Sequence, residues 1–139
     1  MALRLVLMLA GAIIIYLGLD LGLGGMRTLG WQGSTDFITV TDPARFAVQD
    51  NHARFVGGVW LGVGLVLLAG SFAVARFRTA LIAMCALVFV GGLMRIASGD
   101  TDTILAMQVL PSLLAELVLF PALGFWLFRT QPGTRADAR

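Results

Sequence analysis

Hydrophobic residues gather in four long runs along this chain, and most polar residues lie between the runs. The runs cover about Leu3–Gly24, Arg54–Arg76, Thr79–Ala97 and Met107–Phe128. A helix needs about 20 predominantly apolar residues to cross the hydrocarbon core of a bilayer. Each run is close to that length, so the pattern predicts four transmembrane helices.

The connections between the runs are short except for one, residues 25–53. Phe77 and Arg78 alone separate the second run from the third, so we expect those two helices to be antiparallel. The chain ends in a polar tail, residues 131–139. These features predict an all-α fold, an integral membrane, antiparallel four-helix bundle that forms one domain over residues 1–130.

The first run begins at the chain's N-terminus, where a signal peptide would lie. It is nearer 20 residues than the 7–15 of a signal peptide, and it contains Asp20. We therefore expect a retained first helix. In the long connection, Asp42-Pro43 is a helix-start signal. Either a short helix lies at the membrane surface there, or that helix continues unbroken into the second run.

The composition agrees with a membrane protein and excludes several other classes. Hydrophobic residues make up 58% of the chain and charged residues 13%, and the mean hydropathy is +0.89. The net charge of +2 is too small to indicate nucleic-acid binding. One cysteine, Cys85, cannot form a disulfide within the chain, and with the single histidine it gives no basis for a metal site or cofactor.

Four ionisable residues stand inside the runs, and all lie towards the same end of their segments. A charge at mid-membrane costs roughly 2.5–3.5 kcal/mol, so four charges at similar depth predict pairing around an internal site. We expect an arginine of this set to pair with one of its acids across helices. The four residues are Asp20, Arg54, Arg95 and Glu116.

Glycines accompany these charges at helical spacing. Gly11, Gly18 and Gly25 recur every seven residues, which predicts a face that admits a close neighbour. Gly58 and Gly62 share a face with Arg54, and Gly91 precedes Arg95 by four residues. These glycines are interpreted first as packing surface and second as the wall of a ligand groove.

The arginines are distributed unequally between the two ends of the predicted helices. Six arginines, Arg4, Arg76, Arg78, Arg129, Arg135 and Arg139, would share one side of the membrane. The positive-inside rule assigns that side to the cytoplasm. We therefore expect both termini in the cytoplasm and the connection 25–53 outside it.

The start of the second run carries a recognisable string, NHARFVGGVWLGVG, over residues 51–64. This string resembles the signature of a bacterial membrane-protein family known as domain of unknown function 4345. The resemblance continues with GGLMR ending at Arg95, and with Glu116-Leu117 followed by Pro121. It implies a small four-helix protein of the bacterial cytoplasmic membrane and names no activity. The motif residues it carries over are Asn51, Arg54, Phe55, Gly57, Gly58, Trp60, Gly62, Arg95 and Glu116.

Charge placement and resemblance together give three interpretations of the outer polar residues. They could only tie helices together, bind a lipophilic small molecule, or catalyse a reaction on one. We expect a non-enzymatic protein that binds a lipid-like molecule, or an accessory subunit of a membrane complex or homo-oligomer. The alternative is a membrane enzyme with Glu116 as general acid and His52 or Asp20 as base. The expected ligand-binding residues are Asp20, Asn51, Arg54, Gly58, Trp60, Gly62, Arg95 and Glu116.

Overall fold

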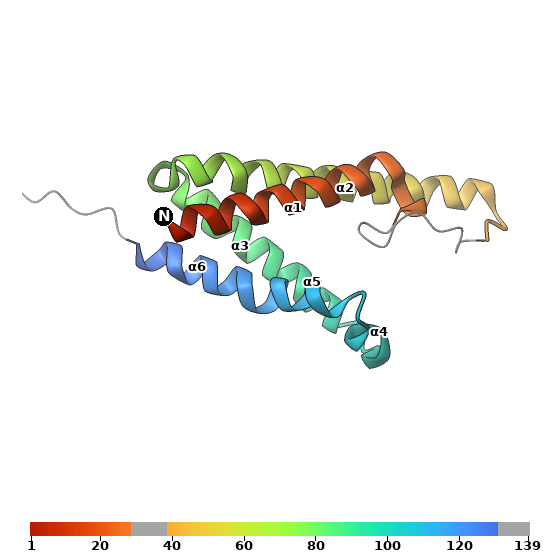
Figure 1. Ribbon diagram of the computed structural model, residues 1–139. Coiled ribbons are helices and arrows are strands. Elements are labelled where there is room, and N and C mark those ends of the chain that lie inside the picture. Colours follow the sequence, from red (N-terminus) through yellow and green to blue (C-terminus); the bar gives the residue numbers. More distant parts are fainter. Residues whose placement is uncertain (29–38, 131–139) are drawn as a thin grey trace, which may run out of the picture. The chain divides into compact units, whose positions relative to one another are not determined.

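The computed structural model describes residues 1–28 and 39–130, and this part of the chain is all-helical (Figure 1). Four helices are long and apolar enough to cross a membrane: Ala2–Arg27, Pro43–Phe72, Val74–Ile96 and Leu110–Arg129. The prediction of four membrane-length helices is confirmed. The chain divides between Phe72 and Ala73 into two compact units. Packing of all four helices into one bundle stays a prediction, and the polar tail 131–139 lies outside the described residues.

The first unit contains α1 (Ala2–Gly24), the single turn η1 (Gly25–Arg27) and α2 (Pro43–Phe72). Helix α2 starts at Pro43 and continues unbroken through Arg54, which is the second of the two alternatives above. The Asp42 carboxylate accepts hydrogen bonds from the N–H groups of Ala44 and Arg45, both at 3.1 Å. No glycine or proline interrupts residues 44–56, so nothing in the sequence ends the helix there.

Glycines bring the backbones of α1 and α2 into direct contact. A Cβ atom added at Gly18 would lie 2.4 Å from the backbone nitrogen of Leu61, and one at Gly57 would lie 2.2 Å from that of Gly22. Farther along the pair, a Cβ at Gly64 would lie 2.7 Å from the nitrogen of Ile15. The close neighbour predicted for the glycine face of the first helix is therefore α2.

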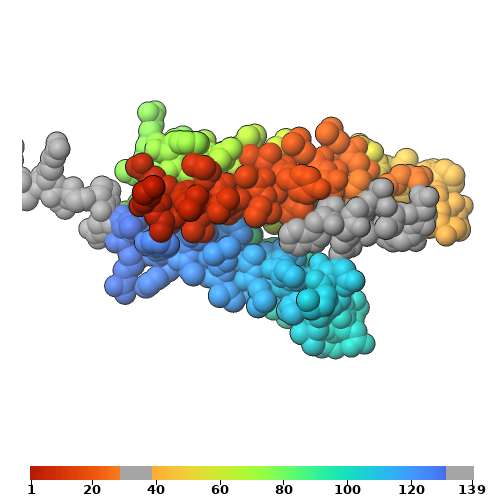
Figure 2. All heavy atoms as spheres, viewed as in Figure 1, coloured from red at the N-terminus to blue at the C-terminus, as the bar shows by residue number. Residues whose placement is uncertain are grey.

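Helix α2 reaches well past the end of α1. Arg54 contacts the last carbonyls of α1, so residues 43–53 extend beyond that end by roughly 16 Å at 1.5 Å per residue. Figures 1 and 2 show this yellow-orange stretch as the projecting end of the first unit. The whole helix is about 45 Å long, whereas a hydrocarbon core measures about 30 Å. Its projecting turns account for much of what was expected to be loop 25–53.

The second unit contains α3 (Val74–Ile96), α4 (Thr101–Leu105), α5 (Leu110–Leu114), the π-helical turn η3 (Ala115–Leu119) and α6 (Phe120–Arg129). Helix α3 starts earlier than the expected Thr79, because only Ala73 departs from helical geometry after α2. The fourth span starts at Leu110 rather than Met107, with Pro111 in its first turn, where a missing N–H is tolerated. Helix α4 was not anticipated, and the Asp100 side chain caps it.

Helix α3 packs antiparallel to the segment from η3 through α6. Arg78 near the start of α3 bonds to the carbonyls of Leu127 and Phe128 at the end of α6, with Nε–O and Nη2–O distances of 2.8 and 2.5 Å. Midway, a Cβ at Gly124 would lie 3.4 Å from the Cβ of Cys85. Cys85 is 2% exposed, so it packs as a small apolar residue, as expected.

Candidate functional site

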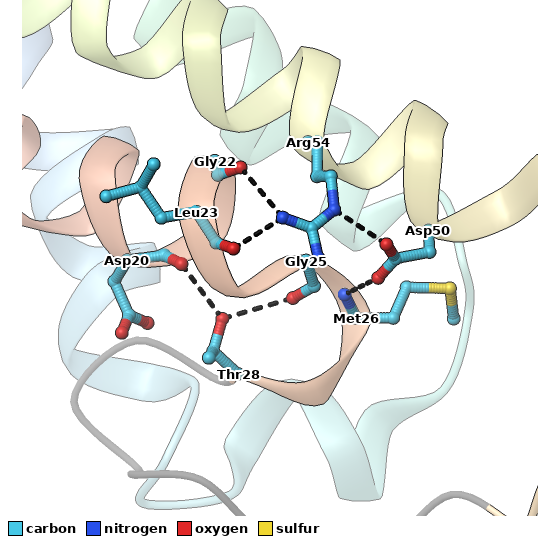
Figure 3. Close-up of polar contacts among 8 residues, drawn as sticks. All are labelled: Asp20, Gly22, Leu23, Gly25, Met26, Thr28, Asp50 and Arg54. Atoms are coloured by element: carbon cyan, nitrogen blue, oxygen red, sulfur yellow. Dashed lines mark hydrogen bonds and ion pairs between the residues drawn. The ribbon is translucent and has the colours of Figure 1, made fainter. Parts of the chain in front are cut away.

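Arg54 lies where α2 passes the C-terminal end of α1, and its guanidinium caps that end. Nη1 donates to the carbonyl of Gly22 at 3.4 Å and to that of Leu23. The last carbonyls of a helix have no partner within the helix and carry its partial negative charge, so a cation there is stabilising. Figure 3 shows the guanidinium between these carbonyls and a carboxylate of its own helix.

That carboxylate is Asp50, which the sequence analysis did not place in the site. Its Oδ2 lies 2.7 Å from Nε of Arg54, one turn along α2. Its Oδ1 accepts the backbone N–H of Met26 at 2.8 Å, which ties η1 to α2 (Figure 3). The spacing of four residues between Asp50 and Arg54 is the sequence signal for this pair, and it becomes visible once α2 is known to begin at Pro43.

Gly25 makes this arrangement possible. It ends α1 with a φ of 66°, a conformation that residues with a Cβ rarely adopt. A Cβ at this position would also lie 2.0 Å from Oδ1 of Asp50. The glycine is therefore required both by backbone conformation and by the approach of the carboxylate.

Asp20 does not pair with Arg54, contrary to one of the pairings that charge placement allowed. Figure 3 shows its carboxylate pointing away from Arg54. The Thr28 hydroxyl donates to the backbone carbonyl of Asp20 at 3.1 Å, not to its side chain. Among the described residues, the buried Oδ2 atom of Asp20 has no hydrogen-bond partner.

In the second unit Arg95 pairs with Glu116, with Nε and Oε2 separated by 3.0 Å. The prediction that an arginine of this set pairs with Asp20 or Glu116 across helices is confirmed for this pair. The two side chains differ in exposure: Arg95 is 44% exposed and Glu116 is 6% exposed. Oε2 of Glu116 is buried, and the Arg95 guanidinium is the opposite charge that faces it.

A distorted turn holds Glu116 against α3. Residues 115–119 form the π-helical turn η3, two residues before Pro121. Proline cannot donate to the preceding turn, and a wider turn is one way for a helix to accommodate it. The sequence analysis expected Pro121 to perturb the helix next to the acid, and η3 is that perturbation. Such turns are rare and frequently occur at functional sites.

Gly92, rather than Gly91, lies against the acid. A Cβ at Gly92 would be 2.8 Å from the Cβ of Glu116, whereas nothing lies within 4 Å of one at Gly91. The sequence analysis noted Gly91 for its spacing from Arg95 and did not single out Gly92, which is the glycine that contacts the acid. One residue corresponds to 100° around the helix, which turns a glycine from the packed side to an open one.

The remaining expected site residues lie along α2. Asn51 and His52 are exposed on its projecting turns, and Trp60 is partly buried. Gly58 and Gly62 are exposed, with open space where a Cβ would be. Within residues 1–28 and 39–130, no group of three or more His, Cys, Asp or Glu side chains could hold a metal ion.

The family model described as a domain of unknown function, DUF4345, matches residues 2–127. The match covers nearly the whole chain, including both charge pairs, and agrees with the resemblance carried by the sequence motifs. No curated protein and no solved structure matches the chain.

Proposed function

The chain belongs to the DUF4345 family, whose description names no activity, and from the geometry of its second unit we propose that it is a membrane protein that binds a lipid-like molecule. The proposed site is the Arg95–Glu116 pair. A lipid-like molecule here means one with a polar head and an apolar tail.

One observation carries the proposal: the pair is only partly satisfied by the protein. Only the Nε atom of Arg95 faces Glu116, and nearly half of the arginine side chain is exposed. Glu116 is almost fully buried. Arg95 has further N–H donors beyond the one that faces Glu116, so its exposed end is available to an acceptor outside the chain, such as a lipid headgroup.

The position of the pair fits a molecule with a polar head. Arg95 is one residue from the end of α3, and Glu116 lies about 9 Å below Leu110, where the fourth span begins. The pair thus belongs to the outer part of its unit, near the boundary between headgroups and hydrocarbon. Met94 and Leu119, which are one and three residues from Arg95 and Glu116 along the chain, are exposed apolar side chains that are available to a tail.

A feature of α2 favours a second function, membership of a larger membrane complex or homo-oligomer. Gly58 and Gly62 are exposed and a Cβ at either would meet nothing within 4 Å. Small residues at this spacing let a second transmembrane helix approach closely. Disulfide cross-linking of Gly58→Cys in membranes tests this function, with Leu5→Cys on α1 as the control. Covalent dimers of Gly58→Cys, but not of Leu5→Cys, would support it.

The arginine distribution supports a place for the protein in the bacterial cytoplasmic membrane with both termini in the cytoplasm. Reporter fusions check this. A C-terminal reporter that is active only outside the cytoplasm should stay inactive, and its activity would contradict the proposed orientation.

Native mass spectrometry of protein extracted in mild detergent tests the lipid-binding proposal. We expect the wild type to retain bound lipid. Arg95→Gln should retain at least about tenfold less lipid than the wild type. Arg45→Gln is the matched control, because Arg45 also pairs with a carboxylate, that of Asp42, but is 90% exposed at the start of α2. Equal retention by all three proteins would contradict the proposal. Turnover of the lipid that Glu116→Gln abolishes without loss of binding would favour the enzyme alternative.

A further inference from the structure

Resting on the second function proposed above, we infer that the open face of α2 binds α2 of a second copy of this chain, parallel to the first and in register with it. The observation behind this inference is a row of exposed residues that runs along α2 at regular spacing. We call this row the α2 stripe, and its residues are Val48, Asn51, Phe55, Gly58, Gly62 and Leu65.

The residues of the α2 stripe are separated alternately by three and four positions. This spacing keeps them on one side of the helix, and it lets two helices stay in contact over several turns. All six residues are exposed. No described atom lies within 4 Å of a Cβ added at Gly58 or Gly62, so a second backbone can approach closely at these two positions.

The α2 stripe continues past the part of α2 that a bilayer would surround. Val48 and Asn51 lie on the turns that project beyond the end of α1 (Figure 1), and the same spacing reaches exposed Ala44. Lipid tails can cover an apolar face inside the membrane, but Val48, which is 55% exposed, lies beyond them. A helix that stands in water is marginally stable without a packing partner. The continuous stripe therefore favours a protein partner over lipid alone.

The composition of the α2 stripe suits a copy of itself. Helix α2 carries Arg45, Asp50 and Arg54, but none of them belongs to the stripe, so two stripes can meet without bringing like charges together. Asn51 is the one polar member, and its amide has both donors and an acceptor, so two Asn51 side chains can bond to each other. An apolar partner would leave that amide unpaired.

The membrane fixes the direction of the pairing. Every copy of one chain inserts with the same orientation, because the arginine distribution that sets it is the same in each. The α2 helices of two neighbouring copies therefore run parallel. A two-fold axis between them brings each stripe residue opposite its own counterpart, so Gly58 meets Gly58. One asparagine in a seam of this spacing fixes the register.

Disulfide cross-linking along α2 in membranes tests the inference, in a Cys85→Ala background so that each variant has one thiol. Asn51→Cys, Gly58→Cys and Leu65→Cys should each give covalent dimers, because each position meets its own counterpart. Val56→Cys is the matched control. Val56 is 44% exposed, but it lies about 160° around the helix from Gly58 and should give at least about fivefold less dimer.

An exchange of charge at Asn51 tests the register. Asn51→Asp should lower pairing in phosphatidylcholine vesicles at least about tenfold, because two carboxylates then face each other. Mixing Asn51→Asp copies with Asn51→Lys copies should restore pairing, which a merely structural role of Asn51 would not produce. Gln49→Glu is the matched charge control on the other side of α2, and it should pair as the wild type does. Energy transfer between donor-labelled and acceptor-labelled copies measures pairing.

The outcomes separate this inference from the second function. Dimers from Gly58→Cys with none from Asn51→Cys and Leu65→Cys would show helices that touch at one point, which overturns parallel, in-register pairing and leaves the oligomer standing. Cross-links from Gly58→Cys to a different protein overturn the second copy as partner and leave membership of a complex standing. The absence of cross-links at all three positions overturns both, and the open face of α2 then faces lipid.

Discussion

Asp50 and Arg54 lie one turn apart on α2, with Oδ2 and Nε separated by 2.7 Å, and together they fasten the end of α1 to α2. The arginine reaches the carbonyls of Gly22 and Leu23, while the aspartate holds the N–H of Met26. A single ion pair therefore supplies both a cation for the carbonyl end of α1 and an acceptor for the turn that follows it.

This relationship predicts that Arg54 and Asp50 are coupled. Arg54→Gln should lower the unfolding temperature of detergent-solubilised protein more than Arg54→Lys, because lysine keeps the charge but loses the forked donors. Asp50→Asn should have much less effect in an Arg54→Gln background than alone, which a double-mutant cycle measures. Strict additivity of the two changes would contradict the coupling.

Gly25 and Gly99 differ in what an added Cβ atom would meet. Both have positive φ, 66° and 71°, but only Gly25 has an atom close to where a Cβ would be, Oδ1 of Asp50 at 2.0 Å. Gly99→Ala should cost about 1–2 kcal/mol of unfolding free energy, from its positive φ alone. Gly25→Ala should cost more. Equal losses in equilibrium unfolding would show that the contact with Asp50 is unimportant.

The backbone contact between α1 and α2 predicts that Gly18 tolerates no side chain. A methyl group there would press on the backbone of Leu61, and forced overpacking of this kind costs typically about 1–3 kcal/mol. Gly58→Ala, on an open face of α2, should be neutral or stabilise the helix by up to about 1 kcal/mol. Chemical unfolding of the two variants side by side checks the difference, and a stability loss in Gly58→Ala as large as in Gly18→Ala would count against it.

The neighbouring glycines of α3 provide the same kind of comparison at the proposed site. Gly92→Ala should displace Glu116, whose Cβ lies 2.8 Å from the added atom, with a loss of about 1–3 kcal/mol and of lipid retention. Gly91→Ala should leave both stability and retention unchanged. If retention falls equally in the two variants, the position of Glu116 against α3 is not what matters.

Asp100 predicts a local pH dependence outside the membrane-spanning segments. Hydrogen bonds from the hydroxyl and the backbone N–H of Thr103 hold the pKa of the Asp100 carboxyl below its ordinary value. A group whose pKa is lowered on folding stabilises the folded state above its unfolded pKa and loses that contribution as the pH falls through the folded pKa. The Thr103 amide should therefore lose protection from hydrogen exchange below about pH 4, relative to other amides of the protein. Asp100→Asn should abolish this pH dependence.

Much of the fold could be predicted from the sequence because its signals are local. Four apolar runs of membrane length predicted the four long helices, since hydropathy is a sum over neighbouring residues. The start of α2 was visible as Asp42-Pro43. The repeat of Gly11 and Gly18 predicted a face for close packing, and the position of Pro121 predicted a disturbed helix beside Glu116.

The sequence also predicted that an arginine meets an acid, but only the tertiary structure decided which residues meet. Arg54 pairs with Asp50 instead of Asp20, and Gly92 rather than Gly91 lies against Glu116. Partner choice depends on how far each helix is rotated about its axis and shifted along its neighbour. Each residue changes these by 100° and 1.5 Å, so a pattern that predicts a helix leaves the identity of its contacts to packing.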